Sequence, residues 1–501
     1  MTSHVPVPHS GRRVKLAEER RWTGEWWLPD GSAHEPGTLT YTPTGGLVLE
    51  LVKGWEYRRW VELLTGMYVH QGYKLDWPVV FGLAGGQRLT LRGLQMLDVE
   101  THPDDTFSEM KLRADVALVG ACVPDAAADH GTRIRFEVEN LSPLTASSGI
   151  TSNWSLGPEG RAPDGSGSVA MKRLPALDVQ TVVGRLRLDR RYDLPKGKVT
   201  KGAFVGTLAE SVFADIYPTR PVSLDDAFEL GTALRQLVSL SSMEDCALIA
   251  MQVEMPRVKQ DFPDGHPGAQ SPAVLDVLFQ QPNAPKPSDD AVRAHEFVFT
   301  ASQVAPETFI PAWFALYEKQ SSALGLLVDV LAGSAQSISA RVLAAVSSAE
   351  AYHAALALDP PMEQEQFDEL RAFIVAAAPE EHRDWVDRRF PRNDFSLSLR
   401  LQYLAEHLDP AIQSALHLDI ARWKREAGRA RNRVAHTGSA GRTDTTVLTA
   451  VAELTAVVVL LHVLVGLGMS DAAILELFNT NPRFRRAAVA SRRLLSSTTP
   501  A

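Results

Sequence analysis

The residues best suited to chemistry lie in the short run Arg431-Asn432-Arg433-Val434-Ala435-His436. An arginine guanidinium can fork onto a phosphate. An imidazole titrates near neutral pH and can move a proton without a metal ion, while the Asn432 amide can orient either group. Breaking an RNA phosphodiester without a cofactor needs a base for the 2'-hydroxyl, a cation for the charge on phosphorus, and positioning. Arg431, Asn432 and His436 are thus of the residue types that could cleave RNA with no metal and no cofactor.

The spacing of these residues on a helix constrains how the site is assembled. Residues 421–431 are basic and predicted to be helical. At about 100° per residue, Asn432 and His436 share a face, whereas Arg431 and His436 lie well apart around the helix axis. Either Arg431 wraps around on its long stem, or a second copy of the helix completes the site. The second arrangement predicts a homodimer with the motif at its two-fold axis. The alternative to a catalytic motif is that these residues form only a solvent-exposed, basic helix face.

Composition limits the class of protein. A chain of 501 residues with 45% hydrophobic and 22% charged residues is typical of a soluble globular protein of two to four domains. A net charge of -9 argues against a protein coated in nucleic acid, although it allows one local basic site. Two cysteines are too few for a disulfide scaffold or a Cys-based zinc site. The first residues lack the apolar core of a signal peptide, so a cytoplasmic location is expected.

One apolar stretch, Val447 to Gly468, is about as long as a membrane span of ~20 residues. Glu453 and His462 interrupt it, and each would be costly in lipid. We expect this stretch to be the central helix of a bundle, buried nearly all round, with no membrane partner.

The chain is predicted to have an α+β fold, with a β-rich N-terminal region followed by a C-terminal all-α helical bundle. Residues 1–325 hold short β-branched and aromatic runs between Gly, Pro and Asp, which indicate antiparallel strands. This region divides into two possible subdomains, about 1–170 and 171–325. Residues 326–501 form the bundle, with expected helices at Ser337–His353, Glu363–Ala377, Ser396–Leu408, Pro410–Arg433 and Thr446–Gly466.

Two features together resemble a known family. The motif Arg431-Asn432-x-x-x-His436 follows a helix carrying Ser-Ala-Glu350-Ala-Tyr352-His353 and precedes a long apolar helix, an order similar to that of the HEPN superfamily. Many members of that helical-bundle family are metal-independent endoribonucleases with an R-x4-6-H motif. The segment Gly24-Glu-Trp-Trp-Leu-Pro29 and the Gly-rich strand pair after it resemble the N-terminal domain of the ApeA family. In that family a β-rich region precedes a C-terminal HEPN domain, and members are associated with bacterial anti-phage defence.

The resemblance implies a role for each motif residue. Arg431 would contact the scissile phosphate, His436 would be the acid/base group, and Asn432 would position one of them. Glu350 would hold Arg431 by an ion pair, the alternative being a solvated helix residue. His353 is expected to be a surface or packing residue, not a catalytic one. HEPN proteins generally work as dimers, so a homodimer through the bundle is implied.

Basic residues around the motif are predicted to bind the RNA substrate. The cations would follow the RNA backbone and the tryptophan would offer a stacking face; the residues are Arg422, Trp423, Lys424, Arg425, Arg429 and Arg433. The alternative is a solvated helix face. A second arginine cluster, at 483–486 and 492–493, either extends this track or decorates the tail.

The resemblance implies an anti-phage effector that cleaves cellular RNA on infection, with transfer RNA among the possible targets. The β-rich half would sense an infection signal, for example a phage-derived protein. Until then it would inhibit the ribonuclease activity of the bundle. The alternative is a non-catalytic scaffold in which a HEPN-like bundle only binds RNA or dimerises.

Overall fold

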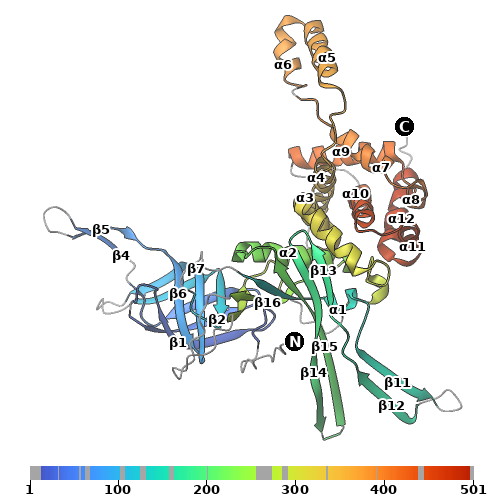
Figure 1. Ribbon diagram of the computed structural model, residues 1–501. Coiled ribbons are helices and arrows are strands. Elements are labelled where there is room, and N and C mark those ends of the chain that lie inside the picture. Colours follow the sequence, from blue (N-terminus) through green and yellow to red (C-terminus); the bar gives the residue numbers. More distant parts are fainter. Residues whose placement is uncertain are drawn as a thin grey trace. The chain divides into compact units, whose positions relative to one another are not determined.

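The computed structural model of the chain forms two compact units (Figure 1). The first comprises Met1–Val238 and Cys246–Ala291, and the second Ser239–Asp245 and Val292–Ala501. The predicted α+β class is confirmed, because strands fill the first unit and helices the second. The structure describes residues 13–31, 33–55, 58–62, 68–101, 108–123, 131–156, 163–199, 201–202, 204–255, 273–284, 291–333, 337–390, 392–437 and 445–496.

Six antiparallel strands close a barrel in the first unit. In barrel order they are β7 (Gln87–Thr101), β6 (Asp76–Ala84), β1 (Arg20–Trp27), β2 (Glu35–Thr42), β3 (Gly46–Leu51) and β8 (Ser108–Ala114). Because β8 pairs with both β3 and β7, the barrel leaves no open edge among these strands. Alternate residues of β2 point inward, and Leu39 and Tyr41 are fully buried there.

A tryptophan and two glycines fix the approach of β1 to its neighbours. Trp26 is fully buried, and its ring lies against Gly82 of β6, where a Cβ would collide with it. A Cβ on Gly24 would likewise collide with the backbone of Leu83 and Ala84. Glycine is therefore required at both positions because backbone or ring occupies the space of a side chain. This packing explains the Gly24-Glu-Trp-Trp segment noted in the sequence.

The same sheet continues beyond the barrel through β9 (Val116–Val119), which pairs with β7. The further strands, in order, are β17 (Ala273–Phe279), β16 (Leu248–Met255), β10 (Arg133–Val138), β15 (Phe204–Pro218), β14 (Gly184–Val199) and β13 (Leu177–Thr181). Two ribbons stand apart from it, β4 (Arg58–Glu62) with β5 (Tyr68–Tyr73), and β11 (Ile150–Leu156) with β12 (Pro163–Met171). The helices here are α1 (Leu141–Leu144) and α2 (Leu224–Ser242), the latter spanning the division between the units.

The second unit is a helical bundle around α10 (Thr445–Gly466). The other helices are η2 (Ala294–Glu296), α3 (Pro306–Ala332), α4 (Ile338–Ala354), α7 (Leu397–Glu406), α8 (Pro410–Leu416), α9 (Ile420–Thr437), α11 (Asp471–Thr480) and α12 (Pro482–Ser496). The compact units divide after residue 291, whereas the sequence-based division at 325/326 falls inside α3. Helix α10 is the one helix of the described residues long and apolar enough to span a membrane, and 78% of that window is buried. It is therefore the central helix that the sequence predicted.

A helical hairpin leaves the bundle between α4 and α7 (Figure 1). It consists of α5 (Gln364–Ala377), η3 (Glu380–His382) and α6 (Arg383–Asp387). Arg371 clamps Asp387 through two hydrogen bonds of 2.8 Å, which tie α5 to α6. No residue of these three elements is buried, and Phe373 and Trp385 are 72% and 60% exposed.

The expected single helix over Pro410–Arg433 is wrong. The chain breaks between α8 and α9 at His417, whose φ of 51° is left-handed. The Leu418 N–H donates to the Gln413 carbonyl at 3.2 Å, which closes the end of α8. The Asp419 carboxylate then accepts the Arg422 N–H at 2.9 Å and begins α9. The apolar pattern of the sequence continues through the break, which is why one helix was predicted. The cap at Asp419 begins a second helix there.

Candidate active site

Helix α9 lies with one face against the bundle and the opposite face in solvent. Its buried residues recur at intervals of three and four, as expected for one side of a helix; they are Trp423, Ala427, Ala430 and Val434. Helix α9 contains six arginine or lysine residues and one glutamate. The apolar stripe therefore decides which of these cations face solvent.

The outward face carries a basic ridge that ends at the histidine. Arg425, Arg429 and Arg433 follow one another at i, i+4 and i+8, and Asn432 and His436 lie on the same side. All five side chains are exposed. Glu426 lies 3.5 Å from Arg425 and 3.3 Å from Arg429. Its single negative charge offsets only part of the positive charge of this surface. We refer to these five residues as the basic ridge.

Arg431 occupies a different position from the ridge. It is about 140° around the axis from His436, five residues on, and it flanks the buried stripe next to α4. Its Nε lies 3.6 Å from Oε2 of Glu350, an ion pair too long for a hydrogen bond. Its Nη1 donates to Asn432 Oδ1 at 3.4 Å. The structure therefore brings together Arg431, Asn432 and Glu350, of which the resemblance paired Glu350 with Arg431.

His436 stands apart from Arg431 within one chain. It lies exposed in the last turn of α9, and no hydrogen bond or ion pair joins its ring to any residue in the described part of the chain. Its ring is therefore accessible to a substrate or to a second protein chain. One chain alone presents the imidazole and the guanidinium on different sides of α9.

Trp423 does not serve as the stacking face that the sequence suggested. The side chain is 1% exposed, and its Nε1 donates to Thr455 Oγ1 of α10 at 3.0 Å. An RNA base cannot reach an indole that is packed inside the bundle. The prediction of Trp423 as an RNA-binding residue is wrong, because the indole anchors α9 to the central helix instead.

Replacing Trp423 by alanine is expected to destabilise the bundle by about 3–5 kcal/mol, because a large cavity would open beside α10. Thr455→Val should cost about 1–3 kcal/mol, since the buried indole N–H would lose its acceptor. Urea-induced unfolding of the full chain measures both changes. Arg425→Ala, on the exposed face of the same helix, is the control and should change stability little. Equal stability of the tryptophan variant and the control would contradict the anchoring role.

The remaining predicted RNA-binding residues are partly engaged within the bundle. Lys424 is half-buried and donates to Gln402 Oε1 of α7 at 2.6 Å. Arg422 is half-buried in the first turn of α9. Arg425, Arg429 and Arg433 remain the exposed cations of the set, so we expect them to contribute more to RNA binding than Arg422 or Lys424.

His353 is a packing residue, as the sequence analysis allowed. It is 2% exposed between the rings of Phe395 and Tyr403, and Arg400 Nη1 lies 3.4 Å from its Nδ1. Burial, together with the nearby Arg400 and His407 charges, lowers the pKa of His353 to about 4. A histidine held neutral and buried in this way cannot donate a proton at neutral pH.

The described residues contain no cluster of three or more His, Cys, Asp or Glu side chains able to hold a metal ion. Three other residues near the second arginine cluster were not predicted from the sequence to belong to a site. Arg341 of α4 and Thr449 and Glu453 of α10 line the cavities beside α12, and only packing between helices distant in sequence reveals them.

A barrel-containing β unit followed by a helical bundle with a basic Arg-Asn-x-x-x-His helix defines the class of protein. Residues 21–313 match the family model of ApeA N-terminal domain 1, and residues 343–473 match that of the Apea-like HEPN domain. The chain belongs to the ApeA family of HEPN proteins, as the sequence resemblance predicted. HEPN domains are generally nucleases, and ApeA-type architectures fit a defence-related family. Comparisons with curated proteins and with solved structures found no match.

Proposed function

We propose that this chain is a metal-independent endoribonuclease that cleaves cellular RNA, with transfer RNA among its targets, as a defence against phage. The observation that carries the proposal is the arrangement on α9. Arg431 is held beside Glu350, while His436 is exposed at the end of the basic ridge. The ridge supplies cations for the RNA backbone, and the motif supplies the groups that break one phosphodiester.

In the proposed mechanism, neutral His436 accepts the proton of the 2'-hydroxyl as that oxygen attacks phosphorus. Protonated His436 then donates to the 5'-oxygen leaving group. Arg431 stabilises the added negative charge on the phosphorane, with Arg429 or Arg433 nearby. The products are a 2',3'-cyclic phosphate and a 5'-hydroxyl end. Incubating the purified chain with RNA in EDTA and mapping the ends tests this chemistry, because loss of cleavage in EDTA would exclude it.

The active form is proposed to be a homodimer whose two α9 helices complete each other's sites. Within one helix Arg431 and His436 point about 140° apart, so the guanidinium of one chain and the imidazole of the other would meet at the scissile phosphate. Two basic ridges facing each other repel unless an anion lies between them. RNA supplies that anion, so we expect RNA to strengthen the dimer.

The α5–α6 hairpin provides an apolar surface for the second copy. Phe373 and Trp385 are largely exposed, although large aromatic side chains are usually buried. The hairpin joins α4, which carries Glu350, to α7, which binds Lys424 of α9. Its ends are therefore connected to both helices that contact the motif helix, and we propose a second copy of this chain as the partner that covers Phe373 and Trp385.

Glu350→Gln is expected to lower kcat by about 10- to 100-fold with little change in RNA affinity, because Arg431 would lose the carboxylate that orients it. Cleavage rates and filter binding of a non-cleavable RNA measure the two effects separately. Glu426→Gln is the matched control, since Glu426 pairs with Arg425 and Arg429 on the ridge but not with Arg431. Equal rates for both variants would remove the positioning role from Glu350.

The β-rich unit is proposed to sense infection, with a phage-derived protein as the trigger, and the whole chain to act in the cytoplasm. A toxic nuclease must be restrained before infection, so low basal activity fits this scheme. The alternative is a scaffold that binds RNA or dimerises without cutting. RNA ends sequenced from cells that express the wild type or His436→Ala separate these functions, because a scaffold produces identical ends in both.

A further inference from the structure

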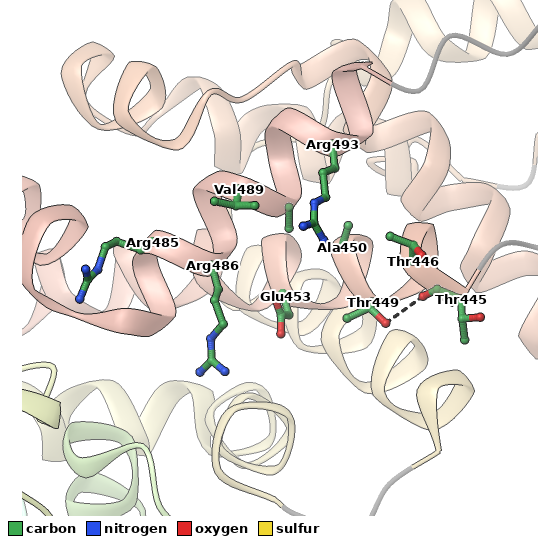
Figure 2. A pocket seen from close by; sticks show the side chains of 10 residues that line it. Thr445, Thr446, Thr449, Ala450, Glu453, Arg485, Arg486, Val489 and Arg493 are labelled. Carbon is green, nitrogen blue, oxygen red and sulfur yellow. Dashed lines mark hydrogen bonds between the residues drawn. The ribbon is translucent and has the colours of Figure 1, made fainter.

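A second cationic site lies away from the motif, in a cavity between α10 and α12 (Figure 2). Its volume is about 550 Å³, within the range of about 300–1,000 Å³ that holds small ligands. Helix α10 lines it from the first turn with Thr445, Thr446, Thr449, Ala450 and Glu453, and helix α12 with Arg485, Arg486, Val489, Ala490 and Arg493.

The arginines of α12 differ in direction. Figure 2 shows Arg486 and Arg493 on the side of α12 that faces α10, whereas Arg485 points away from Glu453. Arg485 donates to the Thr480 carbonyl at 3.4 Å, which occupies part of its guanidinium. Arg486 and Arg493 therefore supply the positive charge that faces the cavity.

Arginines outnumber carboxylates among the described residues around this cavity. Arg483 and Arg341 lie close to Glu453, around an adjoining space too small for a water molecule. Burial and the neighbouring Arg486 and Arg341 lower the pKa of Arg483 to about 10, although Glu453 opposes the shift. Nε of Arg341 is buried without a hydrogen-bond partner in the described part of the chain. One carboxylate is thus surrounded by several guanidiniums.

That carboxylate does not neutralise them by direct pairing. Within the described part of the chain, the side chains of Glu453, Arg483 and Arg486 make no ion pair within 4.0 Å and no hydrogen bond. Arg486 is exposed on the side of α12 that faces the cavity, so its charge and that of Arg483 would attract an anion from solution to this position.

The cavity walls suit a phosphate carried by a nucleotide. The cavity reaches the first turn of α10, where the positive end of the helix dipole favours phosphate. The Thr449 hydroxyl donates to the Thr445 carbonyl at 2.8 Å and so sets the side chain toward the cavity rim. Val489, Ala490 and Ala450 provide an apolar wall, against which a base or ribose can pack.

We propose that the groove between α10 and α12 binds the phosphate of a nucleotide, either free or within an RNA strand, at a site separate from the Arg431–His436 motif. Arg486 and Arg493 bind the phosphate, and Glu453 limits the affinity by repelling it. Binding here depends on none of the residues assigned to cleavage, so the proposal stands independently of the proposed ribonuclease activity.

The test is calorimetric titration of the full chain with inorganic pyrophosphate, with AMP, and with a 5'-phosphorylated 2'-deoxy tetranucleotide that cannot be cleaved through a 2'-hydroxyl. Arg486→Ala and Arg493→Ala should each weaken binding by about 10- to 100-fold, the loss expected for a charge-assisted hydrogen bond. Arg492→Ala, on the same helix but outside the cavity lining, is the control.

Glu453→Gln gives a prediction of opposite sign. Removing the carboxylate should tighten binding about fivefold, because one repulsive charge is lost near the phosphate. Binding of AMP or pyrophosphate indicates a free nucleotide as the ligand, whereas binding of the tetranucleotide alone indicates an RNA strand. No binding of any probe, or equal binding by Arg493→Ala and Arg492→Ala, would overturn the proposal. Arg493 is exposed, so its variant is expected to fold.

Discussion

A His436→Ala chain is expected to lose RNA cleavage by about 10²–10⁴-fold, the contribution typical of a positioned acid/base group, while keeping RNA binding. The imidazole is exposed and makes no contact that supports the fold in the described part of the chain, so its removal should leave the bundle intact. Cleavage of labelled RNA in EDTA measures the rate, and filter binding in the same buffer measures affinity.

The matched control for this variant is His295→Ala, which removes an exposed histidine of η2 in the same unit. Wild-type rates for the control and a large loss for His436→Ala support an acid/base role. Wild-type cleavage by both variants would mean that His436 performs no chemistry. Loss of binding and cleavage together would make His436 a contact for RNA backbone only.

Mixing two inactive variants is expected to restore about one quarter of wild-type activity if each site uses both chains. In a heterodimer of Arg431→Ala with His436→Ala, one site lacks both groups and the other contains the intact arginine and the intact histidine. Random exchange makes about half of the dimers mixed, and one of the two sites in each mixed dimer works. Co-expression with two different tags, followed by sequential purification, isolates these heterodimers, which should then show about half of wild-type activity in a cleavage assay.

The complementary outcome is equally informative. If Arg431 wraps around α9 to meet His436 of its own chain, every mixed dimer stays inactive, because each chain lacks one group. Light scattering of each variant with and without RNA shows whether dimers are present in the assay. Recovered activity from a single variant purified with both tags would indicate residual wild-type chain and is the control for this experiment.

The sequence alone determined the architecture and the location of the motif. Periodic strands in the first part and long apolar helices in the second predicted the α+β order, and the helices at 337–353, 363–377 and 446–466 lie where the structure has α4, α5 and α10. These features are local, since residue periodicity and composition report which face of an element is buried. The sequence also shows Glu350 ahead of Arg431 and His436, the order that resembles the family.

Only the tertiary structure decided which members of the basic segment face solvent. Trp423 and Arg425 are both plausible RNA contacts by residue type, but the bundle buries the first against Thr455 and exposes the second. The groove beside α12 likewise depends on helices distant in sequence, because Arg341, Glu453 and Arg486 come from α4, α10 and α12. Local pattern fixes the face of a helix, whereas the partner that covers that face is chosen by packing across the whole unit.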